Sequence, residues 1–241
     1  MILEGNVSVK AAIMAGRRKV EKLYIAKDKH DKDSMYILHR AEDKGIEIIR
    51  PERQVIDDMA QGRTHGGLVA VAESRGYQDL EDCFEENSFL VCIEGVEDPF
   101  NLGYMLRSLY SAGCSGVLLR QRDWTSAEAT ILKASAGASE WINVVLCDDM
   151  PAAVRQCRQR GLYAYAAMRR DAIPYFEADF SRPVLIGIGG EMRGLSAAVL
   201  KEMDQNIYIP YANDFRNALN AAGAAAAIGF ELMRQRQYAG S

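Results

Sequence analysis

The residues most able to do chemistry near the middle of the chain are Asn101 and Arg107, within residues 98–108 (DPFNLGYMLRS). This segment joins a short apolar run to a predicted helix. An arginine side chain presents five N–H donors in a planar fork and stays charged, so Arg107 could orient an anionic or hydroxyl group. An alternative explains both residues without any site: Asn101 occupies a helix N-cap position, and Arg107 is a solvated helix charge.

A second candidate site is the glycine-rich run LIGIGGEMRGL near the carboxyl end, where glycines flank the end of a predicted strand. Glycine at Gly187, Gly189 and Gly190 permits a positive φ angle and close approach of a ligand to the backbone. A simple turn is the alternative, because a lone glycine cluster is a weak signal. Glu191 follows the glycines, and its carboxylate could fix the guanidinium of Arg107 through a bidentate pair.

A third segment follows, with Ile209 and Pro210 at the end of a predicted strand and residues 217–222 (NALNAA) beyond it. In order and spacing, the three segments resemble the three motifs of the SpoU-type RNA 2'-O-ribose methyltransferases, also called the TrmH family, in the knotted SPOUT class. The resemblance extends over most of the chain. It implies an α/β fold, an RNA substrate (rRNA or tRNA) and S-adenosyl-L-methionine as the methyl donor.

The resemblance also implies a role for each motif residue. Arg107 and Glu191 are expected beside the methyl donor, and Asn101 and Asn220 are expected to place the target ribose. The donor pocket is expected along the backbone of the second and third motifs. Its predicted cofactor-binding residues are Gly187, Gly189, Ile209 and Leu219.

Methyl transfer from a sulfonium to a hydroxyl is a displacement in which the donor supplies the leaving group. The protein must therefore align the nucleophile and help to remove its proton. Because the pKa of arginine lies above about 12, we expect Arg107 to orient the 2'-hydroxyl and an adjacent phosphate rather than to act as the base. The residue that finally accepts the proton stays open.

Three positions depart from the family pattern. Gly190 stands where the family often has asparagine, Met192 where it usually has glycine, and Ala222 where serine is expected. Loss of that hydroxyl puts in doubt one hydrogen bond to donor or substrate. Retention of Arg107, Glu191 and Asn220 favours an active enzyme. Two alternatives stay open: a non-catalytic RNA-binding or ribosome-assembly protein that kept the fold, and an enzyme that uses another small nucleotide.

The elements that must position these residues alternate regularly between strand and helix. In parallel strand–helix–strand units the functional loops lie at the carboxyl ends of the strands, where the first motif is placed. The alternation predicts a mostly parallel sheet covered on both faces, and the resemblance adds a carboxyl-terminal trefoil knot. The predicted strands are 88–96, 115–120, 141–147, 162–168, 184–188 and 206–210, and the predicted helices begin near 101, 126, 149, 196 and 214.

Residues 1–72 form a predicted smaller α/β domain that resembles the ribosomal-protein-like RNA-binding domain often found before the SpoU-type domain. Residues 17–19 (RRK) form a basic cluster that could contact RNA phosphates, or else a solvated helix end. Residues 73–87 are acidic and lack an apolar period, so we predict an interdomain linker there and a methyltransferase domain over 88–241. The helices predicted in the first domain are 8–13 and 34–44, and its strands are 20–26, 46–49 and 67–72.

Charge limits how RNA could be bound. The formal net charge is -4, with a balance of +2 over residues 1–72 and -6 over the remainder. Any RNA contact must therefore use local patches.

Composition also bears on compartment, metals and assembly. No apolar run approaches the roughly 20 residues of a membrane helix, and the first residues carry no signal-peptide pattern, so we expect a cytoplasmic protein with no membrane partner. The five cysteines and three histidines form no ligand pattern, so we predict buried thiols and no metal. The alanine-rich run at residues 221–227 permits close helix packing, and by resemblance it lies near a homodimer interface.

Overall fold

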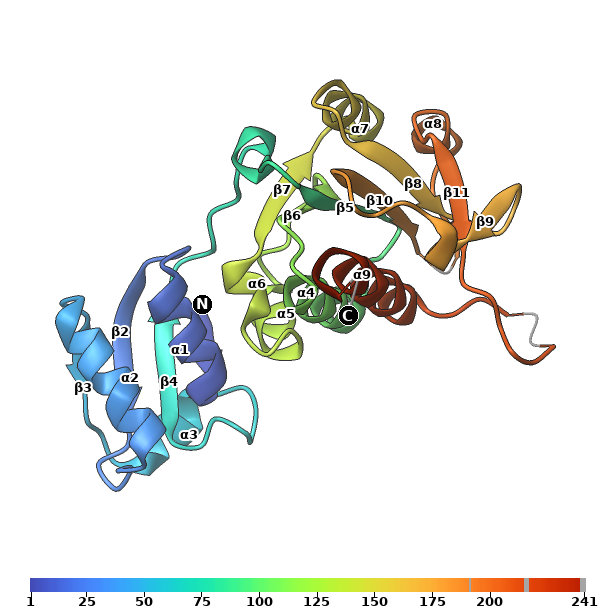
Figure 1. Cartoon of the computed structure of the whole chain (residues 1–241). Helices are drawn as coiled ribbons and strands as arrows, with labels where there is room; N and C mark the ends of the chain where they lie inside the picture. Colours follow the sequence, from blue (N-terminus) through green and yellow to red (C-terminus); the bar gives the residue numbers. More distant parts are fainter. Residues whose placement is uncertain (191, 215–216, 239–241) are drawn as a thin grey trace. The chain divides into compact units, whose positions relative to one another are not determined.

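The structure is a computed structural model that describes residues 1–190, 192–214 and 217–238. Contacts between its residues divide the chain into two compact units, which are described separately (Figure 1). Unit 1 contains residues 1–76 and 124–141, and unit 2 contains the rest of the chain. The chain therefore passes between the two units three times.

Unit 1 is built on a four-stranded sheet in the order β1-β4-β2-β3. Strand β4 is antiparallel to both of its neighbours, whereas β2 and β3 are parallel. Alternate residues of β4 face opposite sides, so Leu68 and Ala70 join the core with α1 and α2, and Val69 packs with Ile56 of α3. The elements are β1 (Ile2–Glu4), α1 (Gly5–Ala15), β2 (Val20–Ile25), α2 (Lys32–Asp43), β3 (Glu47–Ile49), α3 (Arg53–Met59) and β4 (Leu68–Ala72).

Residues 124–141 add two short helices to unit 1, α5 (Glu128–Ala134) and α6 (Ala138–Trp141). The sequence pattern predicted one helix there, from about residue 126 to 136. The helix is broken because Ala136 and Gly137 have φ angles of 51° and 89°. Leu132 of α5 is fully buried in the core of unit 1, so this stretch belongs to that core by packing.

Unit 2 is built on a seven-stranded sheet in the order β7-β6-β5-β10-β8-β11-β9. All of its recorded strand pairings are parallel, which confirms the predicted sheet. Strand β10 is inserted between β5 and β8, and in open parallel sheets ligands bind beyond the carboxyl ends where the strand order changes direction. The strands are β5 (Phe89–Glu94), β6 (Gly116–Arg120), β7 (Asn143–Cys147), β8 (Tyr163–Ala167), β9 (Ala172–Pro174), β10 (Val184–Gly189) and β11 (Gln205–Tyr208).

Helices cover both faces of this sheet (Figure 1). Helices α4 (Pro99–Ser111) and α9 (Ala221–Tyr238) pack together on one face, and α7 (Met150–Gln159) and α8 (Ala197–Leu200) pack together on the other. The last helix was predicted from about residue 214, but residues 217–220 lie outside it. Side chains buried between the sheet and α7 include Leu90, Leu118, Leu185 and Val154.

The acidic stretch at residues 73–87 is divided between the units. The N–H of Glu73 donates to the carbonyl oxygen of Lys19 at 2.9 Å within unit 1. A short 3-10 helix, Leu80–Cys83, belongs to unit 2 and buries both of its end residues in the core there. The predicted boundaries at residues 72 and 88 concern independent folding and stay a prediction.

Candidate active site

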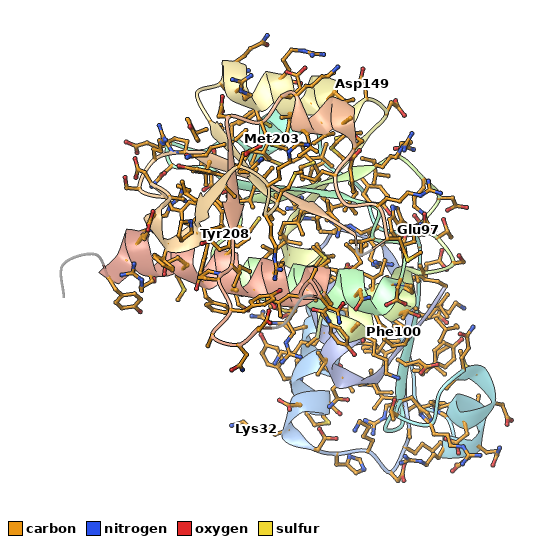
Figure 2. All side chains as sticks on the ribbon, turned by 90° about the vertical axis from the view of Figure 1, so that its right-hand side faces the viewer. Lys32, Glu97, Phe100, Asp149, Met203 and Tyr208 are labelled. Atoms are coloured by element: carbon orange, nitrogen blue, oxygen red, sulfur yellow. The ribbon has the colours of Figure 1, made fainter. Side chains whose placement is uncertain are left out.

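The first motif forms the turn from β5 into α4, between the labelled residues Glu97 and Phe100 in Figure 2. The side chain of Asp98 accepts the N–H of Asn101 at 2.8 Å, and Pro99 occupies the first helical position. Asp98 is therefore the N-cap, and the assignment of Asn101 to that position was wrong. The Asn101 side chain has no recorded partner among the described residues, which leaves its amide free for a substrate.

Arg107 lies further along α4, whose buried face consists of leucine and methionine side chains. Its side chain is exposed and has no recorded partner within the described part of the chain. It shares the exposed face with Tyr104, three residues earlier, whose side chain is 48% exposed. Asn101 and Arg107 are six positions apart and so differ by about 120° around the helix. The helix alone does not bring them together.

The second motif lies beside the first. Strands β5 and β10 are parallel neighbours in which Glu94 is paired with Gly189, so both strands end at the same level. The N–H of Gly190 donates to the carbonyl oxygen of Glu94 at 2.7 Å. The strand that leads into the first motif is therefore hydrogen-bonded to the second motif at the carboxyl edge of the sheet.

Two glycines of the second motif, Gly189 and Gly190, are required by close backbone packing. A Cβ at Gly190 would collide with the carbonyl oxygen of Gly95, and one at Gly189 would collide with the backbone of Gly194. A Cβ at Gly187 would lie 2.7 Å from the Cε atom of Met203. Positive φ angles occur at Gly95 and Gly194 instead. The expectation that the motif glycines permit a positive φ was therefore wrong.

The third motif begins at the end of β11, from which β10 is separated by β8. Ile209 is half-buried directly after β11. Leu219 is 41% exposed, and its N–H donates to the hydroxyl oxygen of Tyr211 at 2.8 Å. Arg169 lies over the ring of Tyr211, 4.3 Å from its centroid. Sequence reasoning missed both of these residues, because no spacing rule links them to the motif.

Asn220 caps the last helix. Its Oδ1 accepts the N–H of Gly223 at 2.7 Å, and its backbone carbonyl oxygen accepts the N–H of Ala224 at 3.0 Å. The Nδ2 group remains as the part of the side chain that could face a ribose. Glu191 lies outside the described residues, so its pairing with Arg107 stays a prediction.

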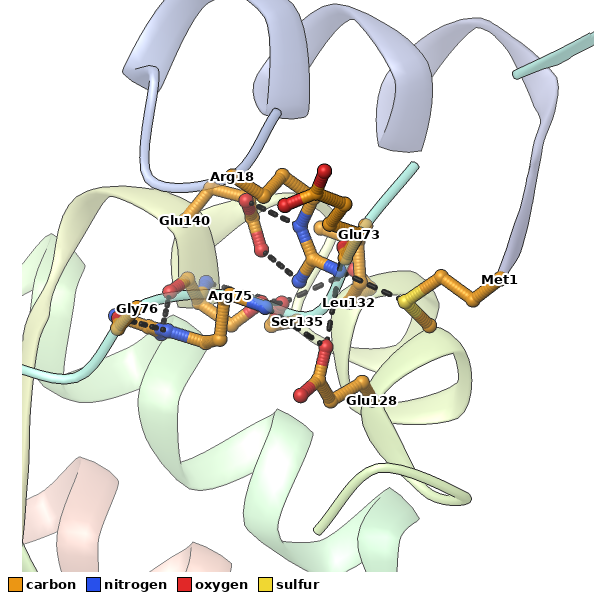
Figure 3. Close-up of polar contacts among 10 residues, drawn as sticks. Met1, Arg18, Glu73, Arg75, Gly76, Glu128, Leu132, Ser135 and Glu140 are labelled. Atoms are coloured by element: carbon orange, nitrogen blue, oxygen red, sulfur yellow. Dashed lines mark hydrogen bonds and ion pairs between the residues drawn. The ribbon is translucent and has the colours of Figure 1, made fainter. Parts of the chain in front are cut away.

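The basic cluster proposed for RNA binding includes one residue that is not at the surface (Figure 3). The Arg18 side chain is 1% exposed, and its Nη2 lies 2.7 Å from Oε1 of Glu140 while its Nη1 lies 2.9 Å from Oε2 of Glu128. Burial lowers the pKa of Arg18, but the hydrogen bonds and charges of Glu140 and Glu128 raise it by more. Arg18 therefore does not contact phosphates, and that part of the prediction was wrong.

Metal ligands, long apolar helices and cysteine thiols are the other features of the described residues that bear on function. They contain no group of three metal-ligating side chains, and no described helix is long and apolar enough to cross a membrane. The free cysteines are buried. Burial raises the pKa of Cys147 to about 11 and that of Cys157 to about 12, so both thiols are protonated at neutral pH.

Comparisons with known proteins match both units. The model of the SpoU rRNA Methylase family matches residues 88–230, and that of RNA 2'-O ribose methyltransferase substrate binding matches residues 2–78. The 23S rRNA (guanosine-2'-O-)-methyltransferase RlmB of Photobacterium profundum is 29% identical, with 97% of each chain covered, and that of Escherichia coli K12 is 26% identical, with 98% of each covered.

Solved structures show the same fold. The SpoU methyltransferase AviRb from Streptomyces viridochromogenes, in complex with the cofactor AdoMet, has a TM-score of 0.82 at 23% identity, covering 98% of this chain and 89% of its own. An rRNA methyltransferase from Sinorhizobium meliloti has a TM-score of 0.80 at 24% identity, covering 97% and 86%. With one family model matching more than half of its length, the chain belongs to the SpoU rRNA methylase family.

Proposed function

We propose that the protein transfers a methyl group from S-adenosyl-L-methionine to the 2'-hydroxyl of a ribose in structured RNA. The observation that carries this proposal is the convergence of the motifs at one edge of the sheet. The end of β5 leads to Asn101 and Arg107, the end of β10 lies in register beside it, and the end of β11 leads toward Leu219. This edge is where open parallel sheets bind ligands.

The residues at this edge fit the methyl donor. Among the described residues, neither the N–H nor the carbonyl oxygen of Ile209 has a recorded hydrogen-bond partner, and its side chain is half-buried. Free peptide groups beside apolar surface suit an adenine ring or a methionine backbone. Gly187, Gly189, Ile209 and Leu219 are proposed to hold the donor. When bound, it supplies an activated methyl group and its own leaving group.

The side chains of the edge are then left with positioning the ribose and managing its proton. We assign to Arg107 the orientation of the 2'-hydroxyl and a neighbouring phosphate, because its free guanidinium is charged and has donors in a fixed plane. Glu191 is proposed to hold that guanidinium. Asn101 and the Nδ2 group of Asn220 are proposed to hydrogen-bond the ribose.

RNA is the proposed partner, and unit 1 is proposed to bind it outside the target nucleotide. The match of residues 2–78 to a substrate-binding model supports this role. Relatives that span the whole chain are named for 23S rRNA, so rRNA is the first substrate to test, with tRNA second. The proposal also includes three features that the family resemblance implies: a carboxyl-terminal trefoil knot, a homodimer through α9 and a cytoplasmic location.

Calorimetry and a methyl-transfer assay test this function. We expect the wild-type protein to bind S-adenosyl-L-methionine and to incorporate its labelled methyl group into rRNA. We expect the Arg107→Ala variant to bind the donor without transferring the methyl group. A protein that binds RNA but no donor at millimolar concentration would instead be a non-catalytic RNA-binding protein with the same fold.

A further inference from the structure

Glu94 is the last residue of β5, and it holds the segment that follows β10 at two points. Its carbonyl oxygen accepts the N–H of Gly190 at 2.7 Å. Its side chain reaches Ser196, where Oε2 accepts the backbone N–H at 2.7 Å and Oε1 accepts the hydroxyl at 3.3 Å. One residue of β5 thus fixes both ends of the turn from β10 into α8.

The backbone between these two points is also tied at its base. Gly190 and Gly194 form an antiparallel bridge, in which the N–H of Gly194 donates to the carbonyl oxygen of Gly190 at 2.9 Å. The hydroxyl oxygen of Ser196 accepts the N–H of Val199 at 3.3 Å and so caps α8. The carboxylate of Glu94 orients that cap. These contacts together fix Gly190, Gly194 and Ser196 relative to the end of β5.

We infer that Glu94 is a positioning residue, which holds the backbone after β10 in the conformation that binds the methyl donor. This inference rests on the proposed function in one respect, because its first test measures binding of S-adenosyl-L-methionine. A carboxylate suits this role because both of its oxygens accept hydrogen bonds, and charge strengthens those bonds. Both carboxylate oxygens accept hydrogen bonds from Ser196, so Glu94 acts on this segment through that residue.

Glu97 offers a matched control. It is a carboxylate three residues further along the chain, in the turn from β5 into α4, its side chain is exposed, and it has no recorded partner among the described residues. A general effect of negative charge at this edge would be shared by Glu94 and Glu97. An effect of the contacts to Ser196 would belong to Glu94 alone.

The first test is donor affinity by calorimetry with S-adenosyl-L-methionine. We expect Glu94→Ala to weaken binding about tenfold, as loss of hydrogen bonds to a charged group implies. Glu94→Gln should stay within about threefold of wild type, because its amide can accept the Ser196 N–H and donate to the Ser196 hydroxyl. Ser196→Ala removes the hydroxyl bond to Glu94 together with the cap of α8, keeps the backbone N–H bond to Glu94, and should lose about threefold. Glu97→Ala should bind as wild type does.

The second test is amide hydrogen exchange of residues 189–196 in the absence of donor. We expect faster exchange in Glu94→Ala and wild-type exchange in Glu97→Ala, with thermal unfolding of both near that of wild type. The inference would be overturned if Glu94→Ala showed the exchange rates and the donor affinity of the wild type. It would also be overturned if Glu94→Gln bound the donor as weakly as Glu94→Ala does. If the wild type binds no donor, the proposed function fails, and the exchange result still decides whether Glu94 holds this backbone.

Discussion

Arg18 in unit 1 and Arg107 in unit 2 are the same residue type in opposite settings. Arg18 is buried and donates to Glu140, Glu128 and the carbonyl oxygen of Glu73. Arg107 is exposed on α4 and has no recorded partner in the described residues. A guanidinium whose donors are satisfied by protein groups supports the fold. One whose donors are exposed and not used by protein groups is available to a substrate.

The contacts around Arg18 in unit 1 also include Arg75, as Figure 3 shows. The side chain of Arg75 donates to the carbonyl oxygens of Ser139 and Gly76, and its N–H donates to Glu128 at 3.1 Å. Two arginines and two glutamates therefore share one site within unit 1. Because its protein partners use these groups, this cluster has little left with which to bind RNA.

The largest effect is expected from the free arginine. Arg107→Ala should lower the rate of methyl transfer by about 10²–10³ or more, as loss of a preorganised donor does, while donor affinity is kept. Glu191→Ala should cost about as much, and the double variant should lose little more, because residues that act as a unit are non-additive. Single-turnover rates measure this, and rates that multiply as independent defects would break the proposed pair.

Arg107→Lys sharpens the same test. Lysine keeps the charge but loses the planar fork of donors, so bidentate positioning predicts a nearly inactive enzyme. A partly active variant would mean that charge alone is required. Donor affinity, measured by calorimetry, serves as the control for folding of the site.

Breaking the buried cluster should affect stability instead of chemistry. Glu140→Ala leaves Arg18 buried with one carboxylate fewer, and we expect a loss of about 3–5 kcal/mol in the free energy of unfolding. Lys19→Ala is the control, because its pair with Glu73 spans 3.5 Å between side chains that are 69% and 55% exposed, and it should cost at most about 1 kcal/mol. Urea unfolding followed by circular dichroism compares the two variants. Equal losses of unfolding free energy would contradict the difference between the buried ion pair and the exposed one.

The sequence predicted the parallel sheet, because alternating strands and helices strongly restrict topology. It misassigned Arg18, whose acidic partners are 110 and 122 positions away along the chain. No local pattern encodes such a distance. The same limit explains why residues 124–141 were not assigned to unit 1, where Leu132 packs.

Other misses were local. Asn101 was placed at the N-cap, although Asp98 followed by proline is also a helix start. The motif glycines were explained by positive φ angles and by close approach of a ligand, whereas the structure requires Gly189 and Gly190 for close approach of Gly194 and Gly95. In each of these cases the residue type pointed to a special position in the chain. The group that the residue contacts could be identified only from the folded structure.

Asn220 caps a helix and is also proposed to bind the ribose, and substitutions can separate the structural role from the proposed catalytic one. Asn220→Ser keeps a side-chain oxygen for the helix cap but removes the amide nitrogen, so stability should hold within a few tenths of a kcal/mol while methyl transfer falls. Asn220→Ala should lose about 1 kcal/mol as well. Thermal unfolding and transfer rates measured on both variants test this. Full activity in Asn220→Ser would remove the ribose role.

The smallest effect is expected from the buried thiols. Because burial raises the pKa of Cys147 to about 11 and of Cys157 to about 12, neither forms appreciable thiolate at pH 8. Alkylation by iodoacetamide at pH 8 should therefore leave the folded protein largely unlabelled, and both residues should react after denaturation. Mass spectrometry of the digested protein reports each site. Rapid labelling of the folded protein would contradict the burial of these residues.

The position of the transferred methyl group tests the central claim most directly. A 2'-O-methyl group blocks alkaline cleavage of the adjacent phosphodiester, so RNA labelled by the enzyme can be hydrolysed in alkali and its products separated. We expect the label from S-adenosyl-L-methionine in alkali-resistant dinucleotides, at full yield with the wild type and at background with Arg107→Ala. Label in single nucleotides, or equal yields from both proteins, would contradict ribose methylation that depends on Arg107.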